Sequence, residues 1–207
     1  MSWVPRSLDD LCDPRRTALV VYDMQVGICS QVADSEAIVA RCVTAVAAAR
    51  AAGMRVAFTR HLSAPKAWMG VTQLRTGMAW QHTDDPDAVK PWFLRETPGS
   101  AIVSALQPTA DDLVVEKLAM SAFEGTPLAF ALRDCGITGV ALCGIALEIG
   151  IAPTVRHAPD LGFIPIVLTD ACGHGNAEAA ERALATMRFV GEAVLTDVVG
   201  FTRALGQ

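Results

Sequence analysis

The sequence lacks any cluster of lysine and arginine residues. Its 17 basic residues are outnumbered by 22 acidic ones, which gives a formal net charge of −5. Proteins that bind nucleic acid usually present a basic stripe to the phosphate backbone. We therefore expect no nucleic-acid partner.

Long apolar runs are also absent. The most apolar stretch, residues 138–151, is interrupted by three glycines and Glu148 and is too short to cross a bilayer. The first residues do not show the basic and then apolar order of a secretory signal. We predict a cytoplasmic protein with no membrane span.

The common cofactor and metal motifs are missing. No strand is followed by a G-x-G-x-x-G turn, a phosphate-binding loop or a G-x-S-x-G elbow. The four histidines have no ligand spacing, and the six cysteines contain no C-x-x-C pair. We therefore predict no cofactor, no metal, and reduced thiols that are mostly buried.

What is present is an alternation of short apolar stretches with segments of helical period. With 207 residues, 52% of them hydrophobic, this predicts one domain over 1–207. The alternation is typical of an α/β fold: a three-layer α/β/α arrangement around a central, mostly parallel six-stranded sheet. Helices are expected to begin near residues 35, 100, 127, 150 and 177, and strands to cover 17–23, 54–59, 112–115, 139–143, 164–168 and 193–196.

One segment breaks this rhythm. Residues 61–98 show no strand pattern, contain several prolines and glycines, and carry three of the four tryptophans. Ligands bind at the carboxyl edge of such sheets, so a long aromatic insertion after a strand is a candidate lid or pocket wall. Ordinary packing under a long loop is the alternative interpretation.

Polar residues stand where strands end. Asp23 closes the first strand, and Lys117 lies just past the third. Alone, Asp23 reads as a helix cap or turn residue and Lys117 as a surface residue. A third feature is the turn from Cys143 into a glycine-bracketed helix start, where backbone amides can face an anion.

Together these points resemble the isochorismatase-like hydrolase superfamily, over nearly the whole chain. Each motif is weak alone, but their order and spacing form a strong signal. They are Val-Val-Tyr-Asp-Met-Gln at 20–25, Pro98-Gly99-Ser100, Val115-Glu116-Lys117, Ser121-Ala122-Phe123, Cys143-Gly144-Ile145-Ala146, the run 154–158, and Thr169-Asp170-Ala171.

The resemblance implies roles for individual residues. Amidases of this superfamily use an Asp-Lys-Cys triad, to which Asp23 and Lys117 correspond, but the cysteine position is Gly150 here. Isochorismatases also carry glycine there, which fits hydrolysis of a vinyl ether with Asp23 as general acid and no covalent intermediate. A nearby Lys117 ammonium would instead favour Asp23 as a base that activates water on an amide.

The resemblance also implies a cis peptide bond between Ile145 and Ala146 that aims backbone amides into the site as an oxyanion hole. Glu148 matches the amidase branch, where a structural role is the simpler interpretation, and departs from the isochorismatase histidine. The candidate pocket residues are Gln25, His61, Trp68, Trp80, Met120, Phe123 and Glu148. A small-molecule substrate and a homo-oligomer are expected by the same resemblance.

The leading hypothesis is therefore a hydrolase that forms no covalent intermediate. A catalytically silent relative that binds a small molecule is the second, because the nucleophile is missing. A third is an amidase that uses Cys143 or Cys29. Cys143 lies within a predicted strand, so a core thiol is the simpler interpretation of that residue.

Overall fold

A six-stranded parallel sheet forms the centre of the computed structural model, which describes residues 4–206. Its order is β3-β2-β1-β4-β5-β6, and each of the five strand pairings is parallel. This confirms the predicted α/β class. The strands are β1 (Thr17–Tyr22), β2 (Arg55–His61), β3 (Leu113–Lys117), β4 (Gly139–Ile145), β5 (Ile164–Gly173) and β6 (Val194–Thr196).

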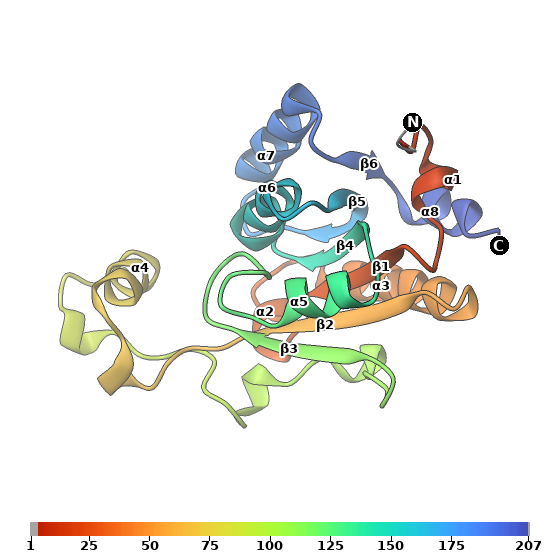
Figure 1. The fold of residues 1–207 in the computed structure, drawn as a ribbon. Helices are drawn as coiled ribbons and strands as arrows, with labels where there is room; N and C mark the ends of the chain where they lie inside the picture. The colour runs from red at the N-terminus through yellow and green to blue at the C-terminus, as the bar shows by residue number, and fades with distance from the viewer. Residues whose placement is uncertain (1–3, 207) are drawn as a thin grey trace.

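Helices cover both faces of the sheet (Figure 1). One face packs against α1 (Leu8–Leu11), α3 (Ser35–Ala51) and α8 (Val198–Ala204). The other packs against α5 (Leu128–Asp134), α6 (Ala152–Asp160) and α7 (Ala177–Val190). Two apolar cores therefore lie on opposite sides of the sheet.

Strand β1 shows how the sequence builds these cores. Every residue of β1 is buried, because a central parallel strand is covered on both sides. Leu19 and Val21 point into the core beneath α3, and Val20 and Tyr22 into the core beneath α5 and α6. The strand ends at Tyr22, and Asp23 follows with a left-handed φ of 47°.

The remaining helical segments are short, except for α4. They are α2 (Val26–Cys29), α4 (Val71–Gln81), the 3-10 turns η1 (Lys66–Trp68), η2 (Pro86–Ala88), η3 (Pro98–Ser100) and η4 (Ser104–Leu106), and the π-helix η5 (Leu147–Ile151). Within residues 4–206, no helix has both the length and the apolar character that a membrane crossing needs.

The prediction of a helix that begins near residue 100 is wrong. Only the 3-10 turns η3 and η4 form there. The physical reason is competition for backbone groups: Ala101 accepts from the amide of Val26, and the amide of Val103 donates to Met24. These bonds hold the segment extended against the loop after β1.

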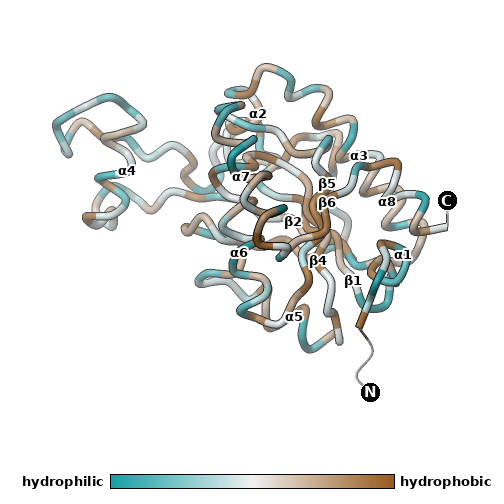
Figure 2. Tube along the Cα trace, turned by 90° about the horizontal axis from the view of Figure 1, so that it is seen from above, coloured by the Kyte–Doolittle hydropathy of each residue, from teal (hydrophilic) through white to brown (hydrophobic). Residues whose placement is uncertain are grey.

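Residues 62–98 form an arm that projects from the body of the molecule, with α4 at its far end (Figure 1). The view from above shows the same projection (Figure 2). Contacts within the arm fix its shape. Lys66 Nζ donates to the Val89 carbonyl at 2.9 Å, and the rings of Trp80 and Trp92 lie with centroids 5.5 Å apart.

Candidate active site

Asp23 and Lys117 meet at the carboxyl edge of the sheet. Asp23 follows β1 and Lys117 ends β3, with β2 between these strands. Lys117 Nζ lies 2.7 Å from Asp23 Oδ2. Both residues are only 3% exposed, so the ion pair is buried.

The intervening strand contributes a third polar group. The Thr59 hydroxyl donates to Asp23 Oδ1 at 2.5 Å and accepts from the Asp23 amide at 3.1 Å. Each carboxyl oxygen of Asp23 therefore accepts from a donor, one of them a cation. An ionised carboxylate, which is an acceptor only, fits these contacts.

Lys117 makes two further contacts within the protein. Its ammonium donates to the Ala119 carbonyl at 3.2 Å and lies 4.4 Å from the centroid of the Tyr22 ring. Burial lowers the pKa of Lys117, and the charge and hydrogen bond of Asp23 oppose that shift. The carboxylate and the ring thus stabilise a cation that burial alone would disfavour.

The turn after β4 has the predicted backbone. The peptide bond between Ile145 and Ala146 is cis. The Ala146 carbonyl then accepts from the amides of Gly150 and Ile151 at 3.0 and 3.1 Å, which closes the wide turn of η5. Gly150 is buried beside Tyr22, on the same face of the sheet as the Asp23–Lys117 pair.

Two predicted pocket residues, Gln25 and His61, lie next to this pair, and their contacts are with other parts of the protein. The Gln25 amide donates to the His61 and Ser100 carbonyls at 3.0 and 3.2 Å, and its oxygen accepts from the His61 amide. The His61 ring meets Phe93 edge-on, and its Nδ1 is buried without a hydrogen-bond partner among residues 4–206. Burial and the charge of Lys117 lower the pKa of His61 to about 4, against the opposing charge of Asp23.

The other predicted residues divide between body and arm. Phe123 is buried and stacks on Phe163 beneath α5, and the Met120 carbonyl accepts from the Tyr22 hydroxyl. Glu148 Oε1 accepts from the amides of Gly175 and Asn176, so this oxygen secures the loop after β5.

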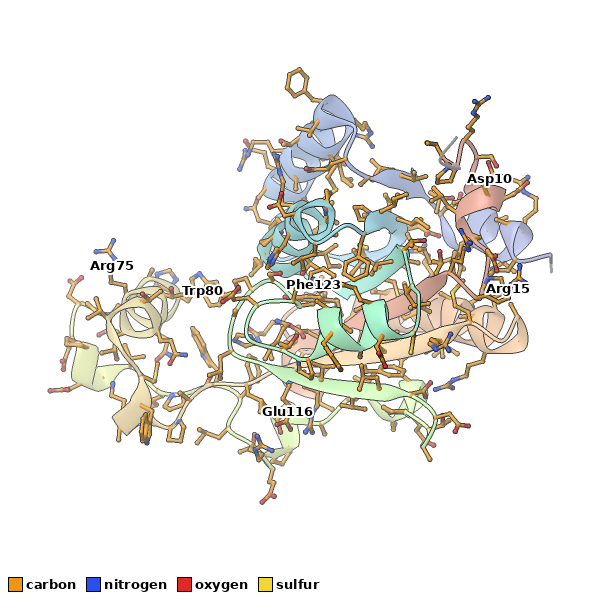
Figure 3. All side chains as sticks on the ribbon, in the orientation of Figure 1. Asp10, Arg15, Arg75, Trp80, Glu116 and Phe123 are labelled. Atoms are coloured by element: carbon orange, nitrogen blue, oxygen red, sulfur yellow. The ribbon has the colours of Figure 1, made fainter. Side chains whose placement is uncertain are left out.

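Trp80 lies on the arm with α4, whereas Phe123 lies over the sheet (Figure 3). Trp68 is 82% exposed and lies in η1. The structure therefore does not bring the two tryptophans to the buried ion pair.

Two adjoining hollows lie where the arm leaves the sheet. One has a volume of about 410 Å³, and its wall includes Lys117, Glu116 and Arg95. The other has about 460 Å³ and is walled by residues at the base of the arm, by Trp68 and by Leu118. Lys117 is thus the member of the buried pair that reaches a space large enough for a small molecule.

The thiols considered as nucleophiles lie in the core beneath α3. Cys143 is fully buried there, whereas Tyr22, Leu147 and Ile151 belong to the core on the opposite face. Cys29 is 7% exposed, and burial followed by the charge of Cys42 raises its pKa to about 11. Within residues 4–206, no three His, Cys, Asp or Glu side chains are grouped so as to hold a metal ion.

Residues 17–198 match the family model described as the isochorismatase domain. The chain belongs to the isochorismatase family. Among curated isochorismatase-family relatives, it is 31% identical over 216 residues to the ureidoacrylate amidohydrolase RutB of Methylobacterium radiotolerans, covering 94% of this chain and 81% of that protein. It is 32% identical over 171 residues to the uncharacterized family protein YecD of Escherichia coli O157:H7, covering 79% and 83%.

Solved structures share the fold of this chain. A cysteine hydrolase from Pseudomonas syringae superposes with a TM-score of 0.80 at 24% identity, covering 93% of both chains. An isochorismatase family protein from Burkholderia thailandensis gives a TM-score of 0.75 at 28% identity, covering 93% of this chain and 97% of that one.

Sequence reasoning missed two members of the site. Thr59 was placed in the second predicted strand, but its position at the carboxyl end of that strand is the signal that could have included it. Tyr22 is the single tyrosine of the chain and directly precedes Asp23. Its contacts with Met120 and Lys117 join residues far apart in sequence.

Proposed function

We propose that this protein hydrolyses a C–N bond in a small amide or ureido compound, with water activated by Asp23 and no covalent intermediate. The observation that carries the proposal is the buried 2.7 Å contact between Lys117 Nζ and Asp23 Oδ2. An adjacent ammonium favours the ionised form of a carboxyl group, and an ionised carboxylate is a base. This favours the amide interpretation over the vinyl ether one.

The mechanism uses the residues at the sheet edge. Asp23 takes a proton from water, and the hydroxide adds to the substrate carbonyl carbon. The negative charge that develops on the carbonyl oxygen is stabilised by Lys117 and by backbone amides of the turn at Ile145 and Ala146. The C–N bond then breaks, the protonated Asp23 returns its proton to the leaving nitrogen, and the carboxylate is restored.

The relatives support the same chemical class. RutB proteins of Methylobacterium radiotolerans and Pantoea ananatis, 31% and 30% identical to this chain, are named ureidoacrylate amidohydrolases. The hollow of about 410 Å³ beside Lys117 provides room for a small molecule of this kind. Vinyl ether hydrolysis is the second reaction, and it requires Asp23 to be protonated so that it can donate to carbon.

A substrate panel tests the proposal. We expect ammonia release from one or more ureido or amide compounds and no pyruvate release from isochorismate. Asp23→Asn should reduce the rate about 10²–10⁴-fold, because it removes the base. Asp111→Asn, an exposed carboxylate, is the matched control and should keep the full rate. Pyruvate release that depends on Asp23 would reverse the assignment in favour of the vinyl ether.

A catalytically silent binding protein is the second candidate function. It is supported by Asp23 itself, which is buried and does not belong to the wall of either hollow, whereas Lys117 does. Under this alternative the panel gives no product. Ligands would then bind with equal affinity to the wild type and to Asp23→Asn, which calorimetry measures.

A further inference from the structure

The place where a side chain on Gly150 would lie is already occupied. A Cβ atom built on Gly150 would fall 2.1 Å from the Tyr22 hydroxyl oxygen and 2.4 Å from the ring atoms Cε1 and Cζ. Carbon atoms in contact are separated by about 3.5–4.0 Å. A side chain at residue 150, a cysteine included, is therefore incompatible with Tyr22 in its present position.

The Tyr22 ring is held from several sides. Its hydroxyl donates to the Met120 carbonyl, and its face lies 4.4 Å from Lys117 Nζ. The side chain is 1% exposed and belongs to the core that includes Leu147, Ile151 and Val155. To move aside, the phenol would lose the hydrogen bond, the contact with the ammonium and its apolar packing.

The charge of Asp23 also acts on the phenol. Burial raises the pKa of Tyr22 well above its ordinary value, and the negative charge of Asp23 acts in the same direction. The phenol therefore keeps its proton at neutral pH. A neutral hydroxyl thus fills the space that a thiol on residue 150 would need.

We infer that Tyr22 and Gly150 form an exchange pair: the phenol occupies the position that corresponds to the missing nucleophile, and residue 150 is glycine because Tyr22 fills its side-chain space. Tyr22 is then the residue that commits this site to a route without a thiol. The inference rests on the proposed function only in that last step. The space itself is tested by stability, so failure of the two ideas can be distinguished.

A double-mutant cycle tests the exchange pair. Gly150→Ala should lower the Tm by about 2–12 °C, because the added methyl group overpacks a filled site. In a Tyr22→Val background, where the ring is absent, the same substitution should cause no loss. In a Tyr22→Phe background the ring carbons remain, so the full loss should persist. Gly70→Ala is the matched control, since its Cβ would meet open space.

The Gly150→Ala variant tests the inference even if the Tyr22→Val protein does not fold. A Gly150→Ala protein as stable as the wild type would overturn the inference by itself. So would strictly additive shifts in the cycle, because neighbours that compete for one space must couple.

Ionisation of the phenol gives an independent readout. Tyr22 is the only tyrosine in the chain, so tyrosinate absorbance reports this one group. In the wild type it should appear only together with alkaline unfolding, followed by tryptophan fluorescence. Ionisation near pH 10, the value of a free phenol, in the folded wild type would contradict the buried position of Tyr22.

Discussion

The carboxyl edge of the sheet and the arm differ in which side chains they bury and which they expose. At the edge, the charged pair Asp23 and Lys117 is 3% exposed, whereas on the arm the large apolar ring of Trp68 is 82% exposed. Charges inside and aromatic rings outside reverse the usual distribution of residues. The difference shows that the fold uses its buried space at the edge for a charged pair and leaves the tryptophan side chains of the arm exposed to solvent.

The largest expected effect comes from breaking the pair at the edge. Lys117→Met leaves the Asp23 carboxylate buried without its counter-charge. We expect a loss of about 3–5 kcal/mol in the free energy of unfolding, which urea denaturation measures. The double variant Asp23→Asn with Lys117→Met removes both charges and should lose less than the sum of the single variants. Additive losses would mean that the two groups do not stabilise each other.

His61 is the last residue of β2, where the sheet edge meets the arm, so its titration tests the environment between the two regions. Its folded pKa of about 4 lies below the ordinary value of 6.5, so the folded protein binds fewer protons than the unfolded chain between these values. The contribution of His61 to the free energy of unfolding is fully present above pH 6.5 and is lost as the pH falls through 4. The loss between pH 7 and pH 5 is about 2 kcal/mol.

The control for this pH dependence is His61→Gln. We expect its unfolding free energy to fall less steeply with acid than that of the wild type, since the residue no longer titrates. Parallel curves for the two proteins would show that His61 is not the group responsible.

The smallest effect is expected on the arm. Trp68→Ala should change the unfolding free energy of the monomer by no more than about 0.5 kcal/mol, because an exposed ring loses few contacts. Trp80→Ala is a useful comparison, since this ring contacts the Trp92 ring at a centroid distance of 5.5 Å. A Tm that depends on protein concentration, and loses that dependence in Trp68→Ala, would support the predicted homo-oligomer and would place the arm in its interface.

The sheet was predictable because its strands are mostly apolar stretches that alternate with segments of helical period. All six observed strands overlap the predicted ranges, and β1 agrees to within one residue. Asp23 and Lys117 were placed at strand ends, and parallel strands bring such ends to one edge. The resemblance to the family supplied the cis peptide bond, which the structure confirms between Ile145 and Ala146.

The elements that were missed depend on contacts between distant residues or on weak local signals. The α4 segment is polar and aromatic, without a clear apolar stripe, and it packs within the arm. Helix α8 has a cap in Asp197, which accepts from the Gly200 amide at 2.6 Å, and that pattern could have revealed it. The position of Tyr22 against Gly150 could not be predicted from either residue alone.

One side chain joins the two regions. Gln25 binds the carbonyls of His61 and Ser100, which flank the two ends of the arm. The two ends of the arm are therefore tied to the same side chain, and the amide of Ser63 adds a hydrogen bond to the Phe93 carbonyl across the base of the arm. A change in length or sequence between these two anchors need not shift β1 or β2, so Asp23 and Thr59 would keep their positions.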